Sequence, residues 1–273
     1  MKRISQLFQN QMYLALRQSS FWMGMLLTGG YAVISFLGDC SRYWGYDSGG
    51  TYAASEMFLY STNHPLWDMF SLVIPFLCVF AFGMQPIEDR ESHIDFCTVS
   101  RMNKREYYIS GALCSMAGTF LITEIPALFC IALYGFTFEE TGFTYEGAKY
   151  SYTYWFNVSD HGSHFQMLHT EHPWLYVLLS SVLFSTGCAV AAFFFYACAT
   201  LIKKEKLWIL LLAAAMSFAI KRFYDHTGYE IYGDIVVSHA VHQRGIPTVI
   251  LGCCFLIAGV IILWLKCRET DDE

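Results

Sequence analysis

The sequence predicts an all-α membrane protein with about six transmembrane helices, and three observations support this class. Of the 273 residues, 55% are hydrophobic and only 15% are charged, whereas soluble domains have about 25% charged residues. Several apolar runs approach or exceed the roughly 20 residues that cross a bilayer as a helix. Most lysines and arginines lie between these runs, in alternate connecting segments, as expected if those segments share one side of a membrane.

The apolar runs give the expected spans. They lie near residues 20–37, 66–84, 108–136, 174–202, 207–220 and 246–265. The fifth run is short before it reaches Lys221 and Arg222, which is compatible with a tilted or incomplete span. Pro75, Pro126 and Pro247 lie in or at the start of spans, where neighbouring helices can satisfy a freed carbonyl. The chain, residues 1–273, is expected to form a single transmembrane domain, since its length leaves no room for a second soluble domain.

Residues 1–18 have the pattern of an amphipathic helix. The apolar residues that recur at helical spacing are Ile4, Leu7, Phe8, Met12, Ala15 and Leu16, with polar residues between them. A helix of this kind is suited to lie in the membrane interface. The first 18 residues are therefore expected to form an interfacial helix before the first span.

The distribution of positive charge predicts the orientation. With six spans and an inside N-terminus, 12 of the 17 lysines and arginines fall in inner segments and five in outer ones. The richer side faces the cytoplasm, so both termini are expected inside, in the cytoplasmic (plasma) membrane. The turn at residues 203–206, Lys-Lys-Glu-Lys, is the clearest marker of the inner side.

The charge and the cysteines exclude two other classes of protein. The net charge is −6 and there is no basic tract, so a nucleic acid is not an expected partner. Most of the ten cysteines lie in apolar runs, where a free thiol behaves as a small apolar residue. The cysteines are thus not expected to form a disulfide framework.

The long outer segment 137–173 is rich in histidine. Low-ranking candidate metal ligands are His161, His164, His169 and His172. Imidazole groups near carboxylates suit zinc or copper, and histidines could also make the loop respond to pH. The segment also contains glycine and serine and shows no fixed geometry, so we expect a solvated loop without a metal.

The inner segment 85–107 shows signs of a short helix. Pro86 suits a first helical turn, and acidic residues near the start favour the positive end of the helix dipole. Asn103 followed by Glu106 has the form of a capping box that starts the third span. We expect a short amphipathic helix at the inner membrane surface, between the second and third spans.

The residues of this segment resemble a known family. Acidic residues at 88, 89 and 91 precede Ser92, Ile94, Phe96 and Ser100, and the segment ends in Lys-Arg-Glu-Tyr at 104–107. This order, with an N-terminal interfacial helix and six spans, resembles the permease subunits of type-2 ABC exporters (ABC transporter permeases). The chain departs from the pattern at His93, where threonine is common, and in lacking a proline near Arg101.

The resemblance implies a coupling helix that docks onto a cytoplasmic ABC ATPase subunit. The residues it assigns to ATPase coupling are Glu88, Asp89, Arg90, Glu91, Ile94, Phe96, Arg101, Lys104 and Arg105. It further implies a dimer with a second permease subunit, the same or homologous, that forms the export path. Since the chain lacks a GxxxxGK[ST] phosphate loop, ATP and Mg are expected in the partner ATPase. This chain is therefore expected to have no cofactor and no enzymatic activity. The apolar spans suggest an amphiphilic cargo such as a peptide, antibiotic or lipid.

Glu124 lies in the middle of the third span. A carboxylate inside a membrane is a candidate functional residue because burying it unpaired is expensive. It could line the translocation path, carry a proton or pair with another span, or it could make a structural hydrogen bond to Ser or Thr near Pro126. Two other function classes stay open: an intramembrane enzyme, for which no HExxH or GxSxG motif occurs, and a non-transporting sensor or scaffold whose outer loops bind a partner.

Overall fold

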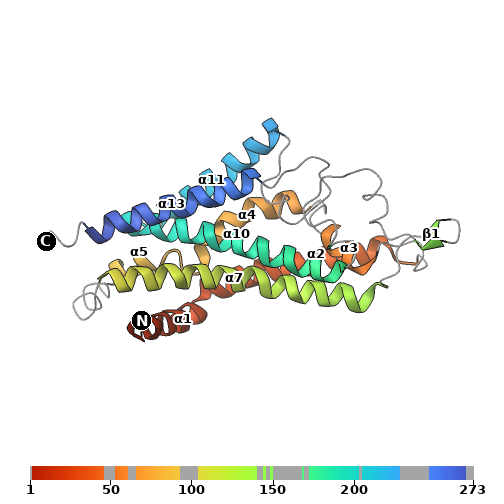
Figure 1. The fold of residues 1–273 in the computed structure, drawn as a ribbon, viewed down its shortest axis with the longest axis horizontal. Helices are drawn as coiled ribbons and strands as arrows, with labels where there is room; N and C mark the ends of the chain where they lie inside the picture. The colour runs from red at the N-terminus through yellow and green to blue at the C-terminus, as the bar shows by residue number, and fades with distance from the viewer. Residues whose placement is uncertain are drawn as a thin grey trace.

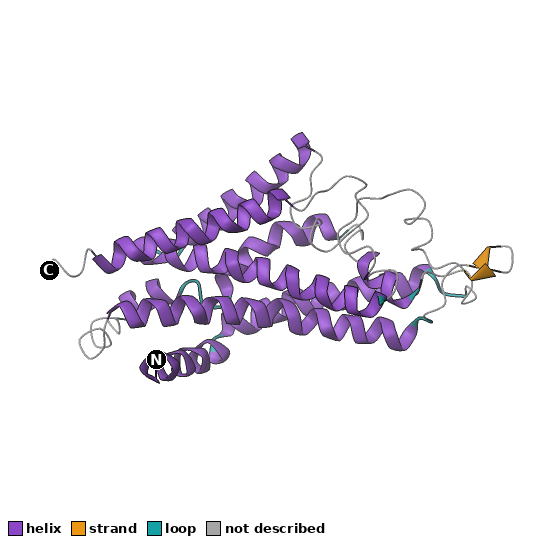
Figure 2. Ribbon diagram, in the orientation of Figure 1, coloured by secondary structure: helices purple, strands orange, loops and turns teal. Residues whose placement is uncertain are grey.

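The structure, a computed structural model, is helical apart from one short hairpin. It describes residues 2–45, 53–60, 66–92, 104–139, 144–145, 148–149, 168, 172–202, 205–227 and 246–268. The helices are α1 (Lys2–Arg17), α2 (Ser19–Arg42), α3 (Ala54–Tyr60), α4 (Trp67–Phe80), α5 (Gln85–Glu91), α7 (Lys104–Thr137), α10 (Pro173–Leu201), α11 (Leu207–Thr227) and α13 (Ile246–Arg268). The strands are β1 (Thr144–Tyr145) and β2 (Ala148–Lys149), which pair antiparallel. Figure 2 shows how helix dominates the chain.

Among the described residues, four helices are long and apolar enough to cross a membrane. They are Ser19–Arg42, Arg105–Thr137, Pro173–Leu201 and Val249–Arg268. A fifth candidate is α4 with α5, which are bent by 46° at a short break. The prediction of an all-α membrane protein is confirmed at this level, with four or five candidate spans.

The fifth expected span, residues 207–220, corresponds to α11. Its apolar part, residues 207–220, is about 21 Å long at 1.5 Å per residue, which is less than the roughly 30 Å of a hydrocarbon core. The helix continues past Lys221, whose ammonium lies 4.0 Å from the carboxylate of Asp225. A total of six spans therefore stays a prediction.

The helices form an elongated bundle around the antiparallel pair α7 and α10 (Figure 1). Helix α13 packs on α10, α1 and α2 pack on α7, and α11 packs on α4. Helix α5, helix α1 and the C-terminal end of α13 lie at one end of the bundle, and α3 and β1 lie at the other (Figure 1).

Small residues bring α7 and α10 into close contact. A Cβ added at Gly111 would overlap with the hydroxyl of Tyr196 on α10, a side chain that is almost fully buried. Four residues further along α7, Ser115 donates a hydrogen bond of 3.4 Å to the carbonyl of Ala192. Small residues of this kind let helices approach closely where no hydrophobic force drives association.

A neighbouring helix satisfies the carbonyl that Pro126 leaves free, as expected. Proline has no N–H for the carbonyl four residues earlier, here that of Ile122. Thr28 of α2 donates to this carbonyl at 2.8 Å. Helix α7 is thus fixed to α2 by a hydrogen bond to the carbonyl that its own backbone leaves free.

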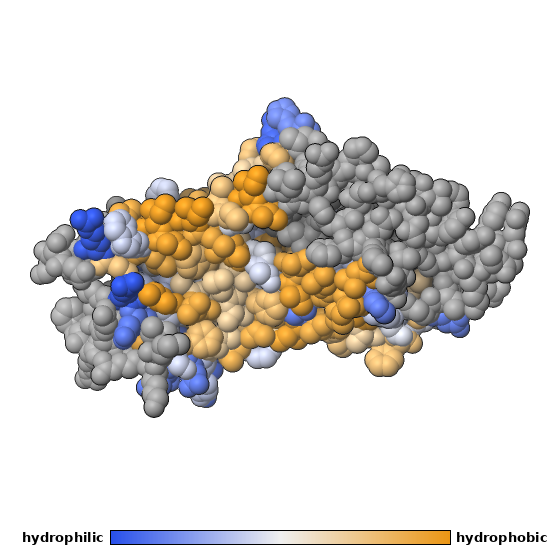
Figure 3. Space-filling view, in the orientation of Figure 1, coloured by the Kyte–Doolittle hydropathy of each residue, from blue (hydrophilic) through white to orange (hydrophobic). Residues whose placement is uncertain are grey.

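The flanks of the bundle are apolar. In Figure 3 orange residues cover the middle of the bundle and blue residues lie toward its ends. On α13 the side chains of Val249, Ile257 and Val260 are more than half exposed. Exposed apolar surface on this scale marks a membrane or protein interface, which agrees with the candidate spans.

Several element ends differ from those expected. Helix α2 extends to Arg42, five residues beyond the expected end at 37, and carries the buried Asp39. Helix α3 lies within a segment expected to be a loop. The second expected span ends as a helix at Phe80 and is followed by a turn. These ends follow tertiary contacts: α3 packs on α7 and α10, and Asp39 accepts a hydrogen bond from Tyr134 of α7.

The expected N-terminal amphipathic helix is present as α1. Its buried residues Leu7, Gln11 and Ala15 recur every fourth position, which places them on one helical face. This face contacts α7, while Tyr13 and Leu14 are each more than half exposed. Helix α1 therefore has one face on the bundle and apolar side chains elsewhere that a membrane surface could cover.

Candidate functional site

The candidate coupling helix α5 begins after a tight turn that follows α4. Gly83 is required in this turn, since a Cβ there would lie 2.9 Å from the carbonyl oxygen of Val79. Pro86 lies in the first turn of α5, as the sequence predicts. Helix α5 ends at Glu91, and Ser92 caps its last turn by donating to the carbonyl of Glu88 at 2.7 Å.

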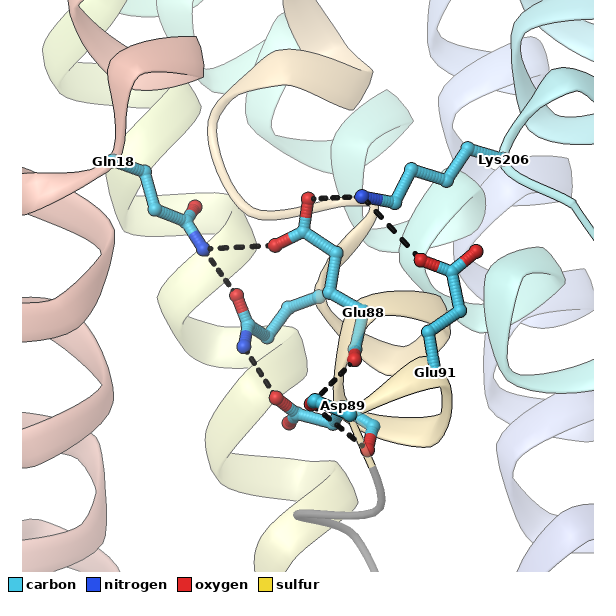
Figure 4. A network of polar contacts seen from close by, with 7 residues as sticks. Gln18, Glu88, Asp89, Glu91 and Lys206 are labelled. Carbon is cyan, nitrogen blue, oxygen red and sulfur yellow. Dashed lines mark hydrogen bonds and ion pairs between the residues drawn. The ribbon is translucent and has the colours of Figure 1, made fainter.

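Two acidic residues of α5 form ion pairs with the segment between α10 and α11. Lys206 lies 3.0 Å from the carboxylate of Glu88 and 3.6 Å from that of Glu91 (Figure 4). The side chains involved are 37–52% exposed, so each pair contributes only about 0.2–1 kcal/mol. The contacts show that the loop before α11 and the segment after α4 lie at the same end of the bundle, where the sequence also places them.

Gln18, between α1 and α2, joins the same network. Its amide donates to the carboxylate of Glu88 at 3.3 Å and to the side-chain oxygen of Gln85 (Figure 4). Gln85 in turn donates to Asp89 at 2.5 Å. This chain of hydrogen bonds links the junction of α1 and α2 to the carboxylates of Glu88 and Asp89 on α5.

The other two charged residues of α5 contact the neighbouring helices α7 and α10. Asp89 is only 7% exposed and accepts a hydrogen bond from the hydroxyl of Tyr107 on α7. Arg90 donates to the carbonyl of Pro86 at 2.8 Å and to that of Ala199 on α10. Helix α5 is therefore attached by side chains to α7, to α10 and to the segments next to α1 and α11.

These contacts change how the predicted coupling residues are understood. Glu88, Asp89 and Arg90 bind other parts of the chain, while Glu91 and Ser92 are exposed at the end of α5. Arg105 is exposed on the first turn of α7. Four other predicted coupling positions lie outside the residues or side chains that the structure describes: Ile94, Phe96, Arg101 and the side chain of Lys104.

The ion pairs raise the pKa of Lys206. The hydrogen bond to Glu88 is the largest cause, and the charges of Glu88 and Glu91 act in the same direction. Partial burial opposes the shift. Lys206 therefore carries its positive charge throughout the neutral pH range.

Glu124 lies in the centre of the bundle, between α7 and α10. It is 5% exposed, and its two carboxylate oxygens accept hydrogen bonds from Ser181 at 3.0 Å and Ser185 at 2.8 Å. Both serines belong to α10, one turn apart. This is the contact expected from the structural alternative, although the partners lie on a different helix from Pro126; a role in a translocation path stays a prediction.

The histidine candidates lie mostly outside the described residues. His161, His164 and His169 are in this group, whereas His172 is exposed immediately before α10. Within the described ranges, no group of three or more His, Cys, Asp or Glu side chains could hold a metal ion. The nine cysteines in those ranges are free thiols.

Sequence reasoning missed several polar partners. Ser181 and Ser185 are spaced by four residues in an apolar run, which places both on one face of a helix, and this signal could have identified them. Gln18 and Tyr107 carried no comparable signal, because their partners are far away in the sequence. Asp39 was assigned to a loop, although it accepts a hydrogen bond of 2.6 Å from Tyr134 in the core.

The chain matches no protein-family model, no curated protein and no solved structure.

Proposed function

We propose that this chain is the membrane-spanning permease subunit of an ATP-driven exporter of the ABC type. In this proposal a separate ATPase subunit binds ATP and Mg, and two permease subunits form the path. The resemblance of segment 85–107 suggests the partner, and the apolar helices suggest an amphiphilic cargo. The cytoplasmic membrane, with both termini inside, is the proposed location.

The observation that carries the proposal is the attachment of α5. A short helix at one end of the bundle contacts α7 through Tyr107, α10 through the Ala199 carbonyl and the start of α11 through Lys206. A force applied to α5 would therefore reach several long helices at once. Such a connection is what a helix needs in order to convert the motion of a bound ATPase into motion of a bundle.

The contacts also indicate which residues of α5 would meet the ATPase. Asp89 is buried and Glu88 is only partly exposed, whereas Glu91, which also pairs with Lys206 at 3.6 Å, and Ser92 next to it are exposed in the described part of the chain. Glu91 supplies a negative charge at the contact. In this proposal the inward-facing acids transmit force, and the exposed C-terminal end of α5 receives it.

Photo-crosslinking in native membranes tests the partner directly. We would place p-benzoylphenylalanine at Ser92 and, as a control, at Phe136, which is 91% exposed at the other end of α7. We expect an ultraviolet-dependent adduct at position 92 with a subunit that carries a phosphate loop. Position 136 should give no such adduct, because it lies at the opposite end of the bundle.

A charge reversal tests coupling in the purified complex. Glu91→Lys should reduce the ATPase activity of the complex severalfold, whereas Asp225→Lys should leave it unchanged. The two acids are matched, since each is about half exposed and lies 3.6–4.0 Å from a lysine. If a folded chain gives no ATPase adduct, or if both reversals have equal effects, the sensor or scaffold alternative replaces the proposal.

A further inference from the structure

A cavity of about 70 Å³ lies between α2, α3, α4, α7 and α10. One water molecule requires only about 10–15 Å³ of such space, so this cavity can hold a group of several heavy atoms. It is in the part of the bundle away from α5. Its wall is made of aromatic side chains and a smaller set of hydroxyl groups.

The aromatic wall is a cluster of Tyr31, Trp67, Phe70 and Phe184. The rings of Tyr31 and Phe70 are stacked, with centroids 4.1 Å apart and an interplanar angle of 7°. The indole of Trp67 lies 5.9 Å from the ring of Phe70 and 6.2 Å from those of Tyr31 and Phe184. These rings come from α2, α4 and α10 and line the cavity. The faces of aromatic rings carry partial negative charge and attract cations.

The hydroxyl groups on the wall direct their hydrogens away from the cavity. Thr28 donates to the carbonyl of Ile122 at 2.8 Å, and Thr123 donates to that of Thr119 at 3.0 Å. Ser181 lies 3.0 Å from a carboxylate oxygen of Glu124 and 2.9 Å from the carbonyl oxygen of Leu178, and its single hydrogen can be donated to either. These hydroxyls are thus engaged within the protein, and the surface of the cavity itself is almost entirely apolar.

Glu124 supplies negative charge directly behind this wall. Its two oxygens lie 3.0 Å from the hydroxyl of Ser181 and 2.8 Å from that of Ser185. The ion pairs among the described residues involve Glu88, Glu91 and Asp225 and do not include Glu124. A positive charge in the cavity would therefore be separated from the carboxyl group of Glu124 only by the hydroxyl of Ser181. Charges interact strongly in such apolar surroundings.

We propose that this cavity binds a quaternary ammonium group. The aromatic cluster and the carboxylate of Glu124 behind it both favour a positive charge. Methyl substituents on nitrogen fit the apolar wall and need no hydrogen-bond acceptor. An anion would meet the carboxylate, and a neutral group would use neither the ring faces nor the charge.

The proposal does not depend on the chain being a permease, because binding is measured without ATP or an ATPase. We would reconstitute the chain in phosphatidylglycerol nanodiscs, which contain no ammonium lipid. Choline and 3,3-dimethylbutan-1-ol, which has carbon in place of nitrogen, would be titrated by saturation-transfer NMR. We expect saturable choline binding at least about tenfold tighter than binding of the neutral isostere. Equal binding, or no saturable binding of choline, would overturn the proposal.

Variants assign the binding to this cavity. Glu124→Gln keeps the shape and should weaken choline binding about tenfold without changing binding of the isostere. Trp67→Leu should weaken choline binding about fivefold, and Trp208→Leu, an exposed tryptophan on α11, should leave it within twofold. Folding is checked by gel filtration; the preference of the unmodified protein for choline over the isostere remains a test if a variant fails to fold. Equal effects of Trp67→Leu and Trp208→Leu would contradict the assignment.

The ammonium group could belong to a free cation or to a lipid headgroup. Nanodiscs that contain phosphatidylcholine distinguish the two sources. Competition by the lipid, seen as weaker choline binding, assigns the site to a headgroup. Unchanged choline binding assigns it to a free cation.

Discussion

Buried carboxylates in this protein accept hydrogen bonds from hydroxyl groups. Glu124 binds two serines of α10, Asp89 binds Tyr107, and Asp39 accepts a hydrogen bond of 2.6 Å from Tyr134. A buried charge without hydrogen bonds is expensive in an apolar medium. Each of these contacts joins residues from different helices, so a residue that would be costly alone fixes the position of two helices.

Lys206 is the residue at which the α5 network can be weakened with the least damage to the core. Lys206→Met removes both ion pairs, to Glu88 and Glu91, and keeps an apolar stem of similar length. Because the side chains are partly exposed, we expect a loss of about 0.5–1 kcal/mol in the free energy of unfolding. Thermal unfolding in detergent measures this as a decrease in Tm.

The pH dependence of this loss follows from the raised pKa of Lys206. A lysine whose pKa is higher in the folded state stabilises the fold fully below its unfolded value, about 10.4. The contribution disappears as the pH rises through the folded value. The Tm difference between Lys206→Met and the unmodified chain should thus be constant from pH 7 to 9 and vanish in strong alkali. Lys221→Met, with a pair at 4.0 Å, should show a smaller difference; an equal one would contradict this account.

At the scale of elements, proline determines where α7 must be supported. Pro126 removes one backbone hydrogen bond inside the helix. Thr28 of α2 supplies a replacement to the Ile122 carbonyl. A missing hydrogen bond that would weaken an isolated helix is therefore replaced by a specific contact between two helices.

A double-mutant cycle tests this coupling. Thr28→Val alone leaves the Ile122 carbonyl without a donor and should cost about 0.5–2 kcal/mol of unfolding free energy. In the background of Pro126→Ala, which restores the N–H, the same change should cost much less. Unfolding of the four proteins in detergent gives the coupling energy. Additive effects of the two substitutions would show that Thr28 does not compensate for the proline.

Helix α5 illustrates how a short element gains a fixed position. Seven residues are too few for a stable isolated helix. Ile87 of α5 is 2% exposed and belongs to the main core cluster. Polar side-chain contacts also connect α5 to α7, to α10 and to the segment before α11. Tertiary packing, rather than helix propensity, holds α5 in place.

At the scale of the whole molecule, polar and apolar side chains occupy different parts of the bundle. The polar network of α5 lies at one end, near α1 and the C-terminal end of α13 (Figure 1). The middle of the bundle has apolar flanks (Figure 3), with Glu124 inside. This division suits a chain that crosses a bilayer and contacts an aqueous partner on one side.

Reporter fusions test the orientation of this arrangement. In a bacterial host, green fluorescent protein fused at the C-terminus should fluoresce, and alkaline phosphatase there should be inactive, because the positive-inside rule places this end in the cytoplasm. Phosphatase inserted within residues 137–173 should be active. Phosphatase activity at the C-terminus would require an odd number of spans or the opposite orientation.

Much of the architecture was readable from the sequence. Apolar runs of sufficient length predict the cores of α2, α7, α10 and α13, because a bilayer requires a continuous apolar helix of about 20 residues. Pro86 correctly marked the start of α5, since proline suits a first helical turn. Glu124 was identified as unusual because a charge within an apolar run is costly wherever the helix packs.

Only the tertiary structure decided which residues meet. The sequence gives no register between α7 and α10, so the pairing of Glu124 with Ser181 and Ser185 depends on how the two helices pack. The family resemblance assigns the acids of α5 to ATPase coupling, whereas Asp89 is buried and Glu88 pairs with Lys206. Periodicity along one helix tells which residues share a face. The partner of that face is set by the packing of distant segments, which no local pattern contains.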